Sequence, residues 1–261
     1  IKALIDNADC SHKARFTLID ADGNEKASTI ADLRPIISAK LPVEDPVLWN
    51  GRKNPYLYTV RCEIFDSTTQ EVTDNIDIRT GLREYHIDSH KGFFLNGEHI
   101  KLQGVSRHQD RENMGNAITE KQHAEDVKII LDVGANSVRL AHYQQNSYFY
   151  DLCDESGLLV WAEVPVISRF SPKRNENAEQ QLVELIKQNY NHPSIFCWGI
   201  ENEITIAGSA NKKLITFLKH MHKVARHLDP TRYTTCAQLT MCPVNSPLNH
   251  ITDIIGYNHY Y

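Results

Sequence analysis

The chain has 261 residues, of which 41% are hydrophobic and 23% are charged, and its formal net charge is −5. This balance is ordinary for a globular protein and gives no reason to expect nucleic acid or an anionic membrane surface as a partner. No apolar run approaches the roughly 18 residues that a membrane span needs, and the six cysteines show no CxxC pairing, which disfavours a disulfide framework or a zinc knuckle.

Residues 1–89 show short strand patterns separated by turns. Residues 15–19 alternate before the hairpin dipeptide Asp22-Gly23, and residues 57–65 and 72–78 are rich in β-branched and aromatic side chains. No long helical period appears in this part. The pattern predicts a small antiparallel β-sandwich. Because Ile1 is not an initiator Met and begins in what reads as mid-strand, we expect the sequence to be a piece of a longer protein.

Near Gly92 the pattern changes to alternating strands and helices. Thr119 with Gln122 three residues later is a capping-box signature for one of the helices. Alternation of this kind predicts a parallel sheet, and six strands fit either a doubly wound sheet or a β/α barrel. Polar residues at the end of one strand after another favour the barrel. The expected strands cover residues 100–105, 137–141, 158–162, the run before Glu203, 234–237 and 253–257.

The stretch SIFCWGIENEIT, residues 194–205, is a buried strand pattern that ends in Glu201, Asn202 and Glu203. An ionised side chain in an apolar setting is costly unless it is paired or used. Glu203 beside Asn202 can be interpreted as a general acid/base next to a hydrogen-bonding amide. The alternative is that Glu203 caps the following helix or pairs with Arg139. We interpret Glu201 as a structural neighbour.

Other side chains expected near the strand ends favour a sugar ligand over a metal. Trp198 and Trp161 would suit the flat apolar face of a sugar. The sequence has no HExxH motif, no G-x-S-x-G motif and no Gly-rich phosphate loop, so spacing supports neither a transition-metal site nor a serine nucleophile. The residues that could instead form a metal site at the strand ends are His108, His142, His259, Glu163 and Glu203.

Several ordered stretches of the chain are similar to motifs of one enzyme family. The first part contains PVLWNGRKNPYLYTV and GLRE, and the second contains GFFLNGEHIKLQGVSRHQD, GANSVRLAHY, DLCDESGLLVWAEVP, NHPSIFCWGIENE and DIIGYNHYY. The chain thereby resembles glycoside hydrolase family 2, which holds the large β-galactosidases, β-glucuronidases and β-mannosidases. The resemblance implies an immunoglobulin-like β-sandwich over residues 1–89, followed over residues 90–261 by the first six strands of an incomplete (β/α)8 TIM barrel.

The resemblance also implies site residues and a reaction, the retaining hydrolysis of a β-glycoside. The family's acid/base is the Glu directly after Asn at the end of the fourth barrel strand, which is Glu203 here, and Asn202 would hold the sugar 2-hydroxyl. Tyr260 matches a tyrosine that lies near the nucleophile in the family. The residues implied to line the pocket are His108, Arg139, His142 and Tyr260.

Within the family, RHQD, RLAHYQ and WAEVP are most similar to β-galactosidases, particularly those of gut-type bacteria, and the glucuronidase-like Lys at position 107 is absent. We therefore expect terminal β-D-galactosides or a related carbohydrate as substrate. A glucuronide or a mannoside is the alternative, and a non-catalytic carbohydrate-binding fragment is a further reading. Glu163 is followed by no Glu-x-His pair of the kind that binds magnesium in metal-dependent members, so no metal or other cofactor is assigned.

The nucleophilic Glu of the family lies at the end of the seventh barrel strand, and this sequence stops after the sixth. No residue here takes that role, so the 261 residues alone are expected to be inactive. Retaining glycosidases need both carboxylates. The resemblance leaves open a homo-oligomer and a compartment that is either cytoplasmic or periplasmic in a bacterium.

Overall fold

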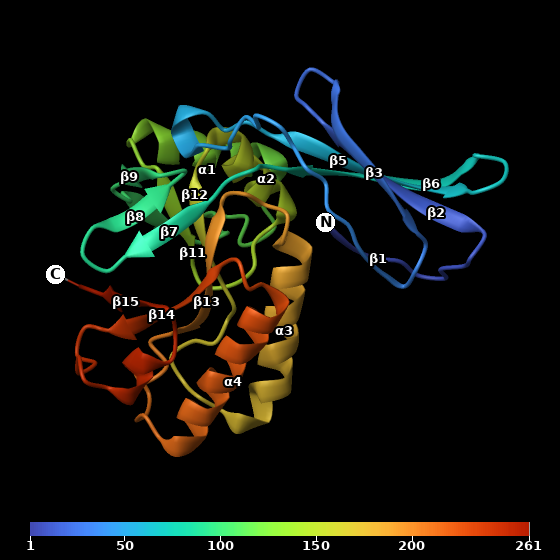
Figure 1. Cartoon of the computed structure of the whole chain (residues 1–261). Helices are drawn as coiled ribbons and strands as arrows, with labels where there is room; N and C mark the ends of the chain where they lie inside the picture. The colour runs from blue at the N-terminus through green and yellow to red at the C-terminus, as the bar shows by residue number, and fades with distance from the viewer. Residues whose placement is uncertain (261) are drawn as a thin grey trace. The chain divides into compact units, whose positions relative to one another are not determined.

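The computed structural model describes residues 1–260, which form two compact units, one from Ile1 to His99 and a second that begins at Ile100 (Figure 1). The expected domain boundary between residues 89 and 90 stays a prediction. In the structure, β8 (Gly92–Leu95) follows this boundary and pairs with β7 (Tyr85–Asp88). The two strands belong to a small sheet that β9 (Glu98–Ile100) completes.

The first unit contains sandwich-like sheets, as expected. A four-stranded antiparallel sheet has the order β3-β2-β5-β6, and a second sheet pairs β1 with β4. Ala14 and Phe16 alternate along β2 toward a core that also contains Leu33 and Ile37. The strands are β1 (Lys2–Leu4), β2 (His12–Ile19), β3 (Glu25–Asp32), β4 (Ile36–Ser38), β5 (Tyr58–Asp66) and β6 (Val72–Thr80), with a 3-10 turn η1 (Gly51–Lys53) before β5.

The second unit is built on a six-stranded parallel sheet whose strands follow one another in chain order. A doubly wound sheet reverses its strand order at a switch point, so the unbroken order excludes that alternative and gives the curled sheet of an incomplete barrel. The strands are β10 (Gly104–Arg107), β11 (Ser137–Leu140), β12 (Leu159–Glu163), β13 (Ile195–Asn202), β14 (Tyr233–Leu239) and β15 (Ile254–Asn258).

Helices between the strands cover the sheet. They are α1 (Glu120–Asp132), α2 (Ser147–Ser156), α3 (Asn175–Asn189) and α4 (Lys212–Leu228), with short 3-10 turns η2 (Pro172–Arg174) and η3 (Pro247–His250). The last two helices lie side by side (Figure 1), and the Glu179 carboxylate of α3 lies 2.8 Å from the His220 Nε2 of α4. None of the helices in residues 1–260 is long and apolar enough to cross a membrane.

Local sequence fixes several helix ends. Thr119 is the N-cap of α1, and the predicted capping box with Gln122 is present. Gly157 closes α2 with φ of 73°, the left-handed conformation that glycine adopts without a steric penalty. Asp229, before Pro230, ends α4. These three signals can all be read in the sequence, and the capping box lies where it was expected.

The first strand of the barrel is displaced from its expected position at residues 100–105. The Asn136 side chain accepts from the Gln103 N–H and donates to the Lys101 C=O, both at 2.8 Å. These bonds satisfy the backbone of residues 101–103 outside the sheet, so β10 starts only at Gly104.

All eight residues of β13 are buried, because alternate side chains face the helices and the barrel interior. Trp161 of β12 fills that interior. An added Cβ at Gly199 would lie 2.6 Å from the Trp161 Nε1, and one at Gly256 would lie 2.7 Å from its Cη2. Glycines on β13 and β15 therefore make the space that this ring occupies.

Candidate active site at the carboxyl ends of the strands

Glu203 directly follows β13 and is 6% exposed. Its φ of 48° lies in the left-handed region, which is uncommon for a residue with a side chain. Its N–H donates to the Ala237 C=O at 2.7 Å. The carboxylate Oε1 accepts from the Asn258 Nδ2 at 2.9 Å and from the Tyr260 hydroxyl at 2.6 Å. The carboxylate is thus held by residues at and just after the end of β15, while β14 holds the backbone of Glu203.

The two alternative uses of Glu203 fail in the described structure. Helix α4 begins at Lys212 with Asn211 as its N-cap, so Glu203 does not cap it. Arg139 pairs with Glu163 instead, with 2.5 Å between Nε and Oε1. With both alternatives excluded, the unusual φ of Glu203 and the contacts of its carboxylate indicate a role in the site itself.

Arg139 of β11 fixes the orientation of two asparagine amides. Its two terminal nitrogens donate to the Asn258 Oδ1 at 2.9 Å and to the Asn202 Oδ1 at 2.7 Å. A guanidinium can only donate, so both amides must turn their oxygens toward it. Asn258 then presents its NH2 to Glu203 and to the Asn202 Oδ1. The Asn202 NH2 has no partner among residues 1–260 and can donate to a ligand.

The two histidines predicted for the pocket lie together at this edge. His142 Nδ1 is 2.8 Å from the Glu163 Oε2. The His108 side chain is exposed, and its ring centroid is 5.2 Å from that of His142 and 5.9 Å from that of Tyr143. The structure thus brings His108 and His142 next to each other and ties the second of them to Glu163.

Glu201 differs from Glu203 in its surroundings. It is 1% exposed, and burial raises the pKa of its carboxyl to about 8, with Glu163 adding to the effect. Its Oε2 accepts from the Ile204 N–H, and its Oε1 accepts from the Gln238 Nε2, both at 3.1 Å. Burial thus favours the neutral form of this carboxyl.

The expectation that Trp198 faces a sugar is corrected by the direction in which its side chain points. Trp198 is fully buried and its Nε1 donates to Asp229 at 2.9 Å, so the expectation that it contacts a sugar is wrong. Arg107 is buried as well, where it pairs with Asp126 at 2.7 Å and lies 3.8 Å above the Phe149 ring. Arg107 packs against α1 and α2, so it cannot discriminate sugars by contact.

Trp161 is likewise placed inside the barrel, with the Arg139 guanidinium 4.6 Å above its ring. The sequence analysis missed Asn258 and Glu163 as site residues, although both stand at predicted strand ends. What it could not indicate is that Arg139 joins them, because Asn258 is 119 residues away along the chain.

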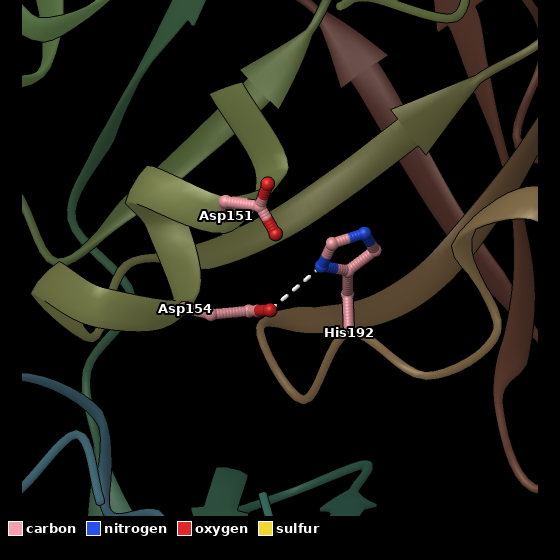
Figure 2. Close-up of side chains that lie close together, drawn as sticks. All are labelled: Asp151, Asp154 and His192. Carbon is pink, nitrogen blue, oxygen red and sulfur yellow. Dashed lines mark hydrogen bonds and ion pairs between the residues drawn. The ribbon is translucent and has the colours of Figure 1, made fainter. Parts of the chain in front are cut away.

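Metal ligation has little support at this edge. Glu163 accepts from Arg139 and contacts His142, so the carboxylate that would serve magnesium is already paired. Among the described residues, three side chains with suitable ligand atoms within 4.8 Å of one another lie at the opposite end of β13 (Figure 2): Asp151, Asp154 and His192. There Asp154 holds His192 Nδ1 at 2.6 Å and the Ser194 N–H at 3.1 Å, so both its oxygens fasten the start of the strand.

Comparison with known proteins follows the same division of the chain. Residues 2–83 match the family model for glycosyl hydrolases family 2, and residues 87–260 match that for the TIM barrel domain of the same family. A β-glucuronidase of Bacteroides fragilis is 42% identical over 84% of this chain. A β-galactosidase of Thermoanaerobacter pseudethanolicus is 32% identical over 83% of this chain.

Comparison with solved structures points to the same kind of enzyme. The crystal structure of an FMN-binding β-glucuronidase from Faecalibacterium prausnitzii has a TM-score of 0.90 and 42% identity over 98% of this chain. The matched part covers 39% of that protein, 32% of the Bacteroides fragilis relative and 29% of the Thermoanaerobacter relative. The chain therefore spans roughly a third of the length of these relatives.

Proposed function

The chain belongs to glycosyl hydrolases family 2, and from this premise we propose that it contributes the acid/base half of the active site of a retaining β-glycosidase. Glu203 is the proposed acid/base, and the nucleophilic carboxylate comes from outside residues 1–260. The observation that carries the proposal is the Glu203 carboxylate itself. It ends a buried strand, and its Oε1 is held by Asn258 and Tyr260.

The contacts of Glu203 suit both halves of the reaction. In the first half, Oε2 gives its proton to the glycosidic oxygen while the nucleophile attacks the anomeric carbon and the bond to the leaving group breaks. Glu203 is then ionised, and the two donors on Oε1 stabilise the negative charge. In the second half, Glu203 takes a proton from the water that hydrolyses the glycosyl-enzyme.

Sugar binding is proposed for the side chains around this carboxylate. The free NH2 of Asn202, fixed in direction by Arg139, would donate to the sugar 2-hydroxyl. The exposed side chains of His108 and Tyr260, together with His142, would line the pocket.

Different observations support two substrates. A terminal β-D-galactoside is supported by the sequence motifs and by the contacts of Arg139. Its guanidinium already donates to Glu163, Asn258 and Asn202, so it does not serve as a partner for a substrate carboxylate. The carboxylate of a glucuronide would need a cation other than Arg139. A β-D-glucuronide is supported by the names of relatives such as the 42% identical protein.

The acid role is tested with Glu203→Gln in the full-length protein. Loss of the proton donor should slow hydrolysis of a poor leaving group by about 10²–10⁴-fold and leave the first step largely intact for a 2,4-dinitrophenyl glycoside. Azide should restore turnover by replacing the water that Glu203 activates. Glu179→Gln, on the surface of α3, is the matched control. Equal rates for Glu203→Gln and wild type on the poor leaving group would refute the role.

The sugar is tested with a panel of 4-nitrophenyl β-glycosides on the full-length wild type. The proposal expects the highest kcat/KM for the galactoside, with the glucuronide as the competing result. Hydrolysis of neither, combined with calorimetric binding of galactose, would support the non-catalytic reading instead.

A further inference from the structure

Glu201 and Glu203 are two residues apart, yet only one of them reaches the mouth of the barrel. Gly199 faces the interior, because an added Cβ there would meet Trp161 and the Cγ of Glu163. Glu201 lies in the irregular segment that follows, where the register between β13 and β14 shifts between Gly199 and Asn202. Its side chain is 1% exposed, so it cannot contact a sugar or an attacking water.

The Glu201 carboxyl closes the turn that carries Glu203. Its Oε2 accepts from the Ile204 N–H at 3.1 Å, a bond that spans Glu203. On the other side of the turn, the Glu203 N–H donates to the Ala237 C=O at 2.7 Å. Between these two bonds Glu203 is kept at a φ of 48°, a conformation that persists only where the surroundings impose it.

Gln238 of β14 offers the partner that a protonated Glu201 needs. Its Nε2 lies 3.1 Å from the Glu201 Oε1, while its own Oε1 is buried without a partner among the described residues. A half turn of this amide exchanges the two atoms and presents the carbonyl to Glu201 at the same distance. The carbonyl can accept a proton donated by a neutral carboxyl, whereas an NH2 cannot.

Burial and the charge of Glu163, on β12, raise the pKa of Glu201. The Ile204 N–H and the Cys236 thiol, on β14, act in the opposite direction. Arg139 on β11 is the opposing cation, and it already pairs with Glu163 at 2.5 Å. A charged Glu201 would be a second buried carboxylate for one guanidinium, and it would lie on the strand that ends in Glu203.

We propose that Glu201 is a positioning residue, whose carboxyl closes the turn that holds the acid/base Glu203 in place. The inference rests on the proposed function of Glu203. It assigns Glu201 no contact with the substrate, and its effect is limited to the step in which Glu203 transfers a proton.

The test compares Glu201→Gln and Glu201→Leu with wild type in the full-length protein, on glycosides with a poor and a 2,4-dinitrophenyl leaving group. A misplaced acid can cost about 10²-fold, so Glu201→Leu should lose about that much kcat on the poor leaving group and much less on the activated one, with KM little changed. Glutamine can still accept from the Ile204 N–H, so it should recover most of the loss.

Asp154→Asn is the matched control, because Asp154 is a buried carboxylate that holds a backbone N–H at the other end of β13. It should lower the melting temperature without any dependence on the leaving group. Equal losses on both leaving groups for Glu201→Leu, or no recovery in Glu201→Gln, would overturn the inference. An inactive wild type, or an active Glu203→Gln, would instead overturn the proposed function.

Discussion

The two ends of β13 are both surrounded by buried charged side chains, but the charges are balanced at one end only. At the amino end Asp229 pairs with Arg232 at 2.8 Å, and Asp154 contacts His192 at 2.6 Å. At the carboxyl end the carboxyl groups of Glu163, Glu201 and Glu203 lie near Arg139, which pairs directly with Glu163 and reaches Glu203 through the Asn258 amide.

This difference indicates that the amino end of β13 serves stability and that its carboxyl end serves catalysis. Pairs at the amino end satisfy each other and fasten β13 to the helices, which is the usual role of that face of a barrel. At the carboxyl end Glu163 pairs with the cation, burial favours the neutral form of Glu201, and Glu203 is held by neutral donors. A surplus of carboxyl groups over cations costs folding free energy unless the groups are used, and this favours the carboxyl end as the place where protons move.

Removing Arg139 should have the largest effect at the carboxyl end of β13, on both stability and activity. Arg139→Met leaves the buried Glu163 carboxylate unpaired, and the loss of one partner of a buried pair costs about 3–5 kcal/mol. It also frees the amides of Asn202 and Asn258 to rotate, so we expect activity to fall by more than about 10²-fold. Thermal unfolding and kcat/KM of the full-length protein measure both effects. Arg61→Met, at an exposed ion pair of the first unit, should change neither.

At the amino end the corresponding change should affect stability alone. Asp229→Ala leaves the Arg232 guanidinium buried and removes the acceptor of the Trp198 N–H, for a cost of about 3–5 kcal/mol in unfolding free energy. The kcat of the protein that remains folded should stay within about twofold of wild type. A selective loss of kcat on poor leaving groups would contradict the division between the two ends.

The sequence predicts the fold well because the signals that set it are local. Hydrophobic runs, the capping box at Thr119 and the glycine at position 157 are each read within a few residues. The direction of side chains in β13 was not predictable, since a strand buried on both faces shows no alternation. That is why Trp198 was expected near a sugar.

The chemistry of the site divides in the same way. Asn202, Glu203 and Tyr260 could be named from motifs, and the structure brings them together with Arg139 and His142. The protonation of Glu201 could not be predicted, because it depends on burial and on the neighbours that three other strands supply.

Gly199→Ala should have a smaller effect at the carboxyl end. The added Cβ would lie 2.6 Å from the Trp161 Nε1 and 2.7 Å from the Glu163 Cγ, and overpacking of this kind costs about 1–3 kcal/mol. Displacing Glu163 should also disturb Arg139, so activity should fall together with the melting temperature. Gly208→Ala, where nothing lies within 4 Å of an added Cβ, is the control. A variant as stable and active as wild type would show that the interior yields more easily than its packing indicates.

The two ends should also respond to pH with opposite sign. Burial raises the pKa of Glu201 to about 8 from an ordinary 4.5. Between these values the folded chain keeps a proton that the unfolded chain releases, so the unfolding free energy falls as pH rises, by about 1 kcal/mol per pH unit. Glu201→Gln removes this dependence, and its stability relative to wild type should grow from pH 5 to pH 8 and then level off.

At the amino end, burial alone would raise the pKa of Asp229, but Arg232, Thr231 and Trp198 hold it below the ordinary 3.8. Its stabilising contribution is present above that value and is lost as pH falls through the folded pKa. Asp229→Asn should therefore be destabilising at pH 7 by an amount that shrinks only in strong acid, while the gain from Glu201→Gln has already vanished near pH 4.5. Melting temperatures of both variants across this range measure the two slopes. If the stability differences of the two variants from wild type changed with pH in the same direction, the proposed difference in charge balance between the two ends of β13 would be refuted.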